Sequence, residues 1–129
     1  MEKKNELIDY WIKSSDYDFE ASGDLYKSGK FAHALFFGHL AVEKILKALF
    51  VKINEDYPPR THNLMMLAKS IDLEIDENHL NEMIEINTFN MEARYPDEKF
   101  GFYKRCTAEF SAEKMRIIGE LIEWLKEKL

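Results

Sequence analysis

FAHALFFGHLAVEKILKALF, residues Phe31–Phe50, is the stretch that decides the fold of this chain. At about 100° per residue, apolar side chains occupy most of the circumference of a helix over this stretch. The remaining arc carries the ionisable side chains His33, His39, Glu43, Lys44 and Lys47. A helix that is apolar nearly all round belongs in the middle of a helical domain. We therefore expect this helix to be central, with its polar arc directed at a groove or a partner, or engaged in internal contacts.

Composition limits the class of protein. The chain has 129 residues, of which 46% are hydrophobic and 33% charged, as expected for one globular domain over residues 1–129. A net charge of −6 argues against a general polyanion binder, and DNA is not an expected ligand. Charges interrupt every apolar run before the ~18 residues of a membrane span, and no secretory signal is apparent. The single cysteine, Cys106, cannot form an internal disulfide, which predicts a cytoplasmic protein.

Helical periodicity without strand-like alternation predicts an all-α fold, an antiparallel up-and-down bundle of four to five helices. The expected helices cover residues 5–28 and residues 31–50 (or to 54), followed by three that are capped by Thr61, Asp76 and Thr107. In the fourth helix, Leu80, Met83, Ile84, Asn87 and Met91 follow helical spacing. Acidic residues without any Lys or Arg between positions 70 and 93 predict a negative outer face for this helix.

RYPDEKFGFYKRC, residues 94–106, does not fit the helical pattern and is predicted to be a long irregular loop. Its cations alternate with aromatic residues; these are Arg94, Lys99, Lys104 and Arg105, with Tyr95, Phe100, Phe102 and Tyr103. Cations for phosphates and rings for bases are what single-stranded nucleic acid or nucleotide binding needs. The alternative is that the rings cover the end of the bundle while the charges stay hydrated.

Two further groups of polar residues have both a structural and a functional interpretation. His39, Glu43 and Lys47 are spaced four apart on one helical ridge, either as a local Glu43–Lys47 pair or as the lining of a site. His62 lies at the predicted start of the third helix, where it is a capping histidine or part of an anion site. His39 and Glu43 provide only two metal ligands from one helix, so no metal or other cofactor is expected.

Three motifs occur in an order that resembles the HEPN domain family over nearly the whole chain: AHALFFGHLAVEKILKALF at residues 32–50, PPRTHNL at residues 58–64 and ARYPD at residues 93–97. The resemblance implies a compact antiparallel helical bundle that dimerises and works beside a minimal nucleotidyltransferase partner. In many branches of the family, the resemblance further implies RNA cleavage by toxins or defence nucleases without a metal.

The resemblance also implies which residues line the site. By position, these are Glu43, Lys44 and Lys47 in the first motif, His62 in the second, and Arg94, Tyr95 and Asp97 in the third. Asn63 stands where the family has Asp. Catalytic members carry an Arg followed four to six residues later by His, whereas no histidine follows Arg94 at that spacing.

These observations lead to three hypotheses about function. The first is a HEPN domain that binds a nucleotide or RNA and acts with a nucleotidyltransferase in a toxin–antitoxin-like pair. Its phosphate ligands would be Arg94, Lys104 and Arg105, with a base stacked on Tyr95 and with His62 and Glu43 lining the cleft. The others are a metal-independent ribonuclease toxin that uses His62 and Arg94, and a module that only binds proteins. The nucleic-acid hypotheses expect the imidazole of His62 and the guanidinium of Arg94 to frame one anionic recess.

Overall fold

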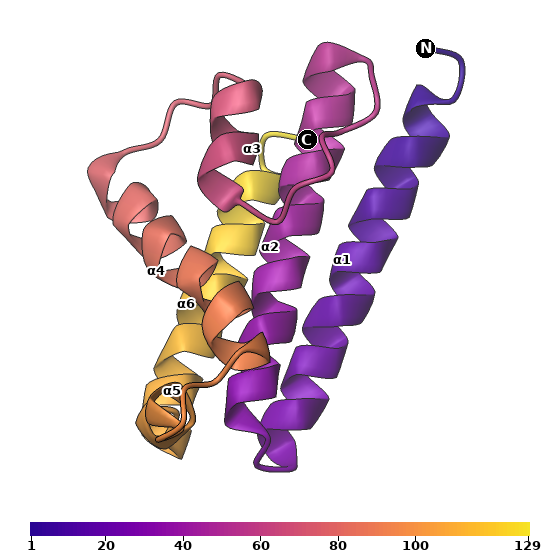
Figure 1. Cartoon of the computed structure of the whole chain (residues 1–129). Coiled ribbons are helices and arrows are strands. Elements are labelled where there is room, and N and C mark those ends of the chain that lie inside the picture. The colour runs from indigo at the N-terminus through magenta and orange to yellow at the C-terminus, as the bar shows by residue number, and fades with distance from the viewer.

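The computed structural model, which describes residues 1–129, consists of six helices and no strand. The helices are α1 (Lys4–Lys27), α2 (Phe31–Asn54), α3 (Leu64–Ser70), α4 (Glu77–Arg94), α5 (Gly101–Arg105) and α6 (Ala108–Lys126). The four long helices alternate in direction along the chain (Figure 1). The prediction of an all-α, antiparallel up-and-down bundle is confirmed, with the five-residue α5 as an element that periodicity did not reveal. None of the helices combines the length and the apolar character that crossing a bilayer requires.

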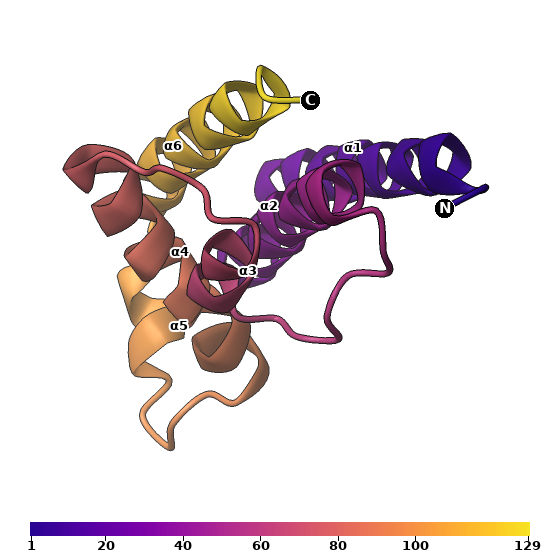
Figure 2. The ribbon, with the colours of Figure 1, turned by 90° about the horizontal axis from the view of Figure 1, so that it is seen from above.

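The central helix is α2, as its apolar circumference predicted. It contacts each of the other five helices, and most of its residues from Ala32 to Val51 are buried. Seen from above, α1 and α6 flank α2 while α3 and α4 cover its remaining side (Figure 2). Gly38 permits the close approach of α6, because a Cβ at this position would lie 2.7 Å from Cδ1 of Ile118.

Helix starts follow the predicted capping residues in two cases out of three. The side chains of Asp76 and Thr107 accept hydrogen bonds from backbone N–H groups at the starts of α4 and α6. Thr61 was the wrong cap for α3, which begins two residues later than predicted and is capped by Asn63. The Asn63 side chain accepts bonds from the N–H groups of Met65 and Met66, whereas Thr61 accepts only the N–H of Asn63.

Of the residues that follow helical spacing in α4, only some face the core, since Met83 is buried. The buried face consists of Met83, Ile86, Phe89, Asn90 and Ala93, whereas Leu80, Ile84 and Met91 are exposed. Apolar residues occur on two sides of this helix, and spacing alone does not say which side meets the core. The large Phe89 ring, which is fully buried and lies 5.6 Å from the ring of Phe102, belongs to the side that does.

The acidic character of α4 is partly neutralised by its neighbours. Lys114 of α6 lies 2.6 Å from Glu85, and Arg105 lies 3.5 Å from Glu92. The acidic residues in and before the first turn of α4 are exposed, namely Asp72, Glu74, Asp76 and Glu77. The negative surface is therefore concentrated at the N-terminal end of α4.

The segment at residues 94–106 is only partly irregular, because it contains α5. Phe102 is buried against the core, and the Tyr103 hydroxyl donates to the carbonyl of Ala93 over 2.6 Å. Tyr95 and Phe100 remain more than half exposed. Two rings thus cover the end of the bundle, as the alternative interpretation held, and two are available on the surface.

Candidate functional site

A buried ion pair lies at the centre of the polar ridge on α2. Oε2 of Glu43 is 3.0 Å from Nζ of Lys47, and the two residues are only 2% and 7% exposed. The Lys47 ammonium also lies 5.2 Å from the centre of the Trp11 ring on α1. A buried carboxylate needs further hydrogen-bond donors to offset its loss of hydration. Its second oxygen, Oε1, can therefore accept a hydrogen bond from another segment of the chain.

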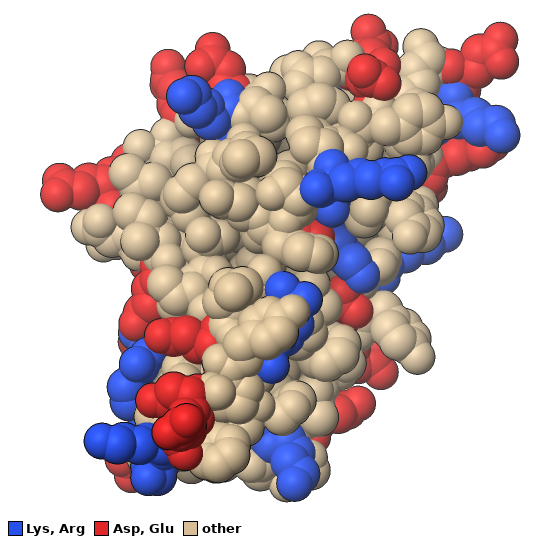
Figure 3. All heavy atoms as spheres, viewed as in Figure 1, with Lys and Arg blue, Asp and Glu red and all other residues tan.

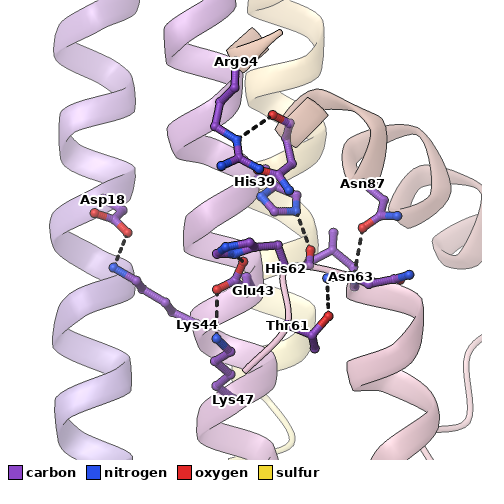
Figure 4. A network of polar contacts seen from close by, with 12 residues as sticks. Asp18, His39, Glu43, Lys44, Lys47, Thr61, His62, Asn63, Asn87 and Arg94 are labelled. Atoms are coloured by element: carbon purple, nitrogen blue, oxygen red, sulfur yellow. Dashed lines mark hydrogen bonds and ion pairs between the residues drawn. The ribbon is translucent and has the colours of Figure 1, made fainter. Parts of the chain in front are cut away.

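This segment lies between α2 and α3 and carries His62. The prolines at positions 58 and 59 keep the chain extended, and it returns across the face of α2 before Asn63 starts α3. Nδ1 of His62 lies 2.8 Å from Oε1 of Glu43 (Figure 4). Because a carboxylate only accepts, Nδ1 carries the proton and Nε2 is left as the second reactive nitrogen. The His62 side chain is 55% exposed, so it links a buried anion to the solvent.

His39 holds the backbone of the same segment. Its Nε2 lies 3.0 Å from the carbonyl oxygen of His62, which requires the proton on Nε2. Burial lowers the pKa of His39 to about 4, although the nearby Glu43 carboxylate acts in the opposite direction. His39 is thus neutral near pH 7, and its Nδ1 is buried without a hydrogen-bond partner. One turn of α2 therefore fixes both the side chain and the main chain of His62.

Arg94 occupies the last position of α4, on the same side of α2 as His62 and beyond His39 (Figure 4). Its Nε donates to the carbonyl of Asn90 over 3.3 Å, and its guanidinium lies 5.2 Å from the ring centre of Tyr95 and 5.9 Å from that of Phe36. No carboxylate lies within ion-pair distance of it. His62 and Arg94 thus lie on one face, but the expectation that they frame one recess is not met. The five main hollows of the surface are lined by other residues, so no large recess lies between them.

Apart from Tyr95, whose ring lies under the Arg94 guanidinium, the other residues predicted for the site lie elsewhere. Nζ of Lys44 is directed at α1, where it lies 2.6 Å from Oδ2 of Asp18. Tyr95, Asp97 and Arg105 line a separate hollow of about 270 Å³ at the end of the bundle. Within it, Asp97 accepts the N–H of Gly101 over 2.6 Å. Lys104 is exposed on α5.

The sequence interpretation missed two polar residues that support this arrangement. Oδ1 of Asn87 on α4 accepts the N–H of Leu64 over 2.8 Å, which ties the start of α3 to α4. Asp18 is 8% exposed on α1, facing Lys44. The signal for Asn87 was present, because a lone amide within a predicted apolar stripe has to find a partner. Asp18 had no such signal, since acidic residues are common along the rest of α1.

The structure has no group of three or more His, Cys, Asp or Glu side chains placed to hold a metal ion. The candidate site comprises a cation without a carboxylate partner, Arg94, and an imidazole, His62, whose proton is directed to a buried carboxylate.

Comparison with known proteins agrees with this architecture. The family model described as HEPN domain matches residues 8–128. The crystal structure of TT1696 from Thermus thermophilus superposes with a TM-score of 0.80 over 100% of both chains, at 18% sequence identity. ST0689, an archaeal HEPN homologue, superposes with a TM-score of 0.75 over 93% of this chain and 95% of that one, at 20% identity. At these identities the likeness to the two structures shows the fold alone. No curated protein matches the sequence.

Proposed function

The chain belongs to the HEPN domain family, and from this premise we propose that it is a single cytoplasmic domain that binds RNA or a nucleotide. In this proposal, the ligand lies on the face of α2 that carries His62 and Arg94. The protein acts as a homodimer beside a nucleotidyltransferase-fold partner, in a toxin–antitoxin-like pair.

The observation that carries the proposal is that Arg94 has no carboxylate partner. Another exposed arginine, Arg116, lies 2.5 and 2.8 Å from Glu113 and Glu120. Arg94 has no such partner, and its guanidinium lies over aromatic rings with its remaining donors unused. A planar guanidinium with unused donors matches the geometry of a phosphate. Lys and Arg side chains lie in the middle of the surface seen in Figure 3 as well as at its edges, with Asp and Glu side chains among them.

The arrangement around Arg94 favours an anion further. His62 lies on the same face with an exposed ring. The buried Lys47 offsets the charge of Glu43, so this carboxylate does not repel a phosphate as an isolated anion would. The net charge of the whole chain is −6, so binding would depend on this local pattern.

Arg94→Ala tests the proposal in a titration of labelled single-stranded RNA, and of ATP, at fixed salt. We expect the Kd for RNA to rise by about tenfold or more, and the slope of log Kd against log salt to fall by about one, because one phosphate contact is lost. Arg116→Ala is the matched control, since it removes the same charge from α6 and should bind like the wild type. Equal binding by the wild type and Arg94→Ala, or no binding by either, contradicts the proposal.

A second candidate function, a metal-independent ribonuclease toxin, is favoured by one specific observation. The bond between Nδ1 of His62 and Oε1 of Glu43 leaves Nε2 as a proton acceptor on the face that carries Arg94. Such an imidazole could remove the proton of a ribose 2′-hydroxyl as this oxygen attacks the adjacent phosphorus. Arg94 would stabilise the charge that develops on the phosphate oxygens, and the 5′-oxygen would leave with a proton from water.

Induced expression in bacteria distinguishes catalysis from binding alone. For the toxin, we expect growth arrest by the wild type and no arrest by His62→Ala, because the proton acceptor is missing. His33→Ala, at an exposed histidine at the start of α2, should arrest growth like the wild type. Absence of arrest together with uncleaved RNA in the purified reaction would leave the binding function alone.

A further inference from the structure

A hollow of about 270 Å³ lies at the end of the bundle, between the C-terminal end of α4 and the short helix α5. Its lining consists of Glu92, Tyr95, Asp97, Gly101, Phe102 and Arg105. Tyr95 connects it to the proposed phosphate ligand, because the guanidinium of Arg94 lies 5.2 Å from the centre of the same ring. Pockets for drug-sized ligands have volumes of about 300–1,000 Å³, so this hollow suits one nucleobase better than a whole nucleotide.

Asp97 gives the hollow a carboxylate that is held in place and still has an oxygen available. Its Oδ1 accepts the backbone N–H of Gly101 over 2.6 Å, which fixes the carboxylate at the start of α5, whereas its Oδ2 makes no hydrogen bond. A Cβ at position 101 would lie 3.4 Å from Oδ2, so the glycine leaves room beside this oxygen. A ligand that enters the hollow can therefore donate to Asp97.

Arg105 gives the same hollow a set of hydrogen-bond donors. Its guanidinium lies 5.3 Å from the centre of the Phe102 ring, and Phe102 is only 6% exposed. The nearest carboxylate, that of Glu92, is 3.5 Å away, at the limit of a hydrogen bond. A guanidinium that lies over a ring and is only weakly paired keeps most of its five N–H donors for a ligand.

These groups match the edges of one base better than those of the other three. Among the bases of RNA, only guanine has two neighbouring N–H donors, at N1 and N2, and two neighbouring acceptors, O6 and N7. Arginine donates two parallel hydrogen bonds to O6 and N7, and carboxylates accept from the N–H groups of base edges. Proteins read single-stranded RNA in this way, with the base stacked on an aromatic ring.

We propose that this hollow is a base-recognition site that selects guanine, with Asp97 accepting hydrogen bonds from N1 and N2 and Arg105 donating to O6 and N7. The inference rests on the proposed function, because Arg94 holds the phosphate of the same nucleotide. It gives Arg105 a role in base recognition in place of phosphate binding. The carboxylates meet the base and not the phosphate, so Arg94 keeps its donors for the phosphate.

Binding of the four ribonucleoside 5′-monophosphates to the wild type, measured by isothermal titration calorimetry at fixed salt, tests the selection. We expect GMP to bind about tenfold or more tightly than AMP, CMP and UMP, because only guanine uses both Asp97 and Arg105 fully. IMP lacks the amino group at N2 and is otherwise identical to GMP. It isolates the contact with Asp97 and should bind about fivefold or more weakly than GMP.

Three variants assign the selection to the hollow. Asp97→Asn keeps an oxygen for the N–H of Gly101 but replaces the available Oδ2 by an amino group, so GMP and IMP should bind equally. Glu98→Gln is the matched control, since it removes the same charge from the next residue, which is exposed outside the hollow, and should keep the preference of the wild type. Arg94→Ala should weaken the binding of every nucleotide by the same factor, because it acts on the phosphate.

Each outcome decides the inference. A preference for GMP that is lost in Asp97→Asn and kept in Glu98→Gln supports it. Equal binding of all the nucleotides, or a preference that survives in Asp97→Asn, overturns the guanine site and leaves the proposed function standing if Arg94→Ala still weakens binding. If no mononucleotide binds, the inference is overturned, and the titration of RNA with Arg94→Ala decides the proposed function separately. The comparison of GMP with IMP needs only the wild type, so it decides the matter even if Asp97→Asn fails to fold.

Discussion

Replacing Glu43 by alanine is expected to lower the free energy of unfolding by about 3–5 kcal/mol, the largest effect predicted for any polar residue of this protein. The substitution leaves the Lys47 ammonium, which is 7% exposed, without the carboxylate that lies 3.0 Å from it. It also removes the acceptor of the His62 imidazole. Urea denaturation followed by circular dichroism measures the change.

The double substitution Glu43→Leu with Lys47→Met separates an orphaned charge from a simple loss of packing. Because it removes both charges and keeps the volume, it should cost far less than Glu43→Ala and should come close to the wild type. A single Glu43→Ala variant that loses less than about 1 kcal/mol would show that the pair is hydrated, contrary to its burial. Equal losses in the single and double variants would show that the charges are not coupled.

Acid is expected to destabilise the fold through His39, by about 3 kcal/mol between pH 6.5 and pH 4. Burial lowers the pKa of His39 from 6.5 to about 4 in the folded state. Over this pH range His39 is protonated in the unfolded chain but neutral in the folded chain. The free energy of unfolding therefore rises with pH. The contribution is fully present above pH 6.5 and is lost as the pH falls towards 4. Denaturation curves measured at several pH values give this slope directly.

His39→Gln is the informative variant for this prediction. The glutamine amide keeps a donor for the carbonyl of His62 but does not titrate, so the stability curve of the variant should be flatter by the same amount. His33→Gln removes an exposed histidine from the same helix and should keep the slope of the wild type. Parallel curves for His39→Gln and the wild type would contradict the predicted neutral state of His39.

Much of the fold could be predicted from local signals in the sequence. The apolar circumference of residues 31–50 placed α2 at the centre, and Asp76 and Thr107 marked the starts of α4 and α6. The signals failed where two local solutions compete. Thr61 and Asn63 are both good caps, and only the position of α3 against Asn87 of α4 selects the second. Both sides of α4 carry apolar residues, and only packing selects the side that includes Phe89.

A local contact of the candidate site could be predicted from the sequence, whereas its long-range contacts could not. The spacing of Glu43 and Lys47 by four residues predicted their pairing, which the structure contains at 3.0 Å. The contact of His62 with Glu43 spans 19 residues and depends on how the proline-containing segment crosses α2. Lys44 has the same residue type as Lys47 and lies three positions away, yet it faces Asp18 on α1. No motif distinguishes these two lysines, because the neighbour of each is set by the packing of α1.

The sequence by itself determined the helical class, the central helix and the residue types available for phosphate chemistry. These properties follow from periodicity and capping, which act between residues a few positions apart. Only the tertiary structure decided that Arg94 has no carboxylate partner, that His62 is held by Glu43 and His39, and that one apolar side of α4 remains exposed. Each of these properties depends on contacts between distant segments and on which side chains are buried. Such contacts are fixed only when the helices pack together.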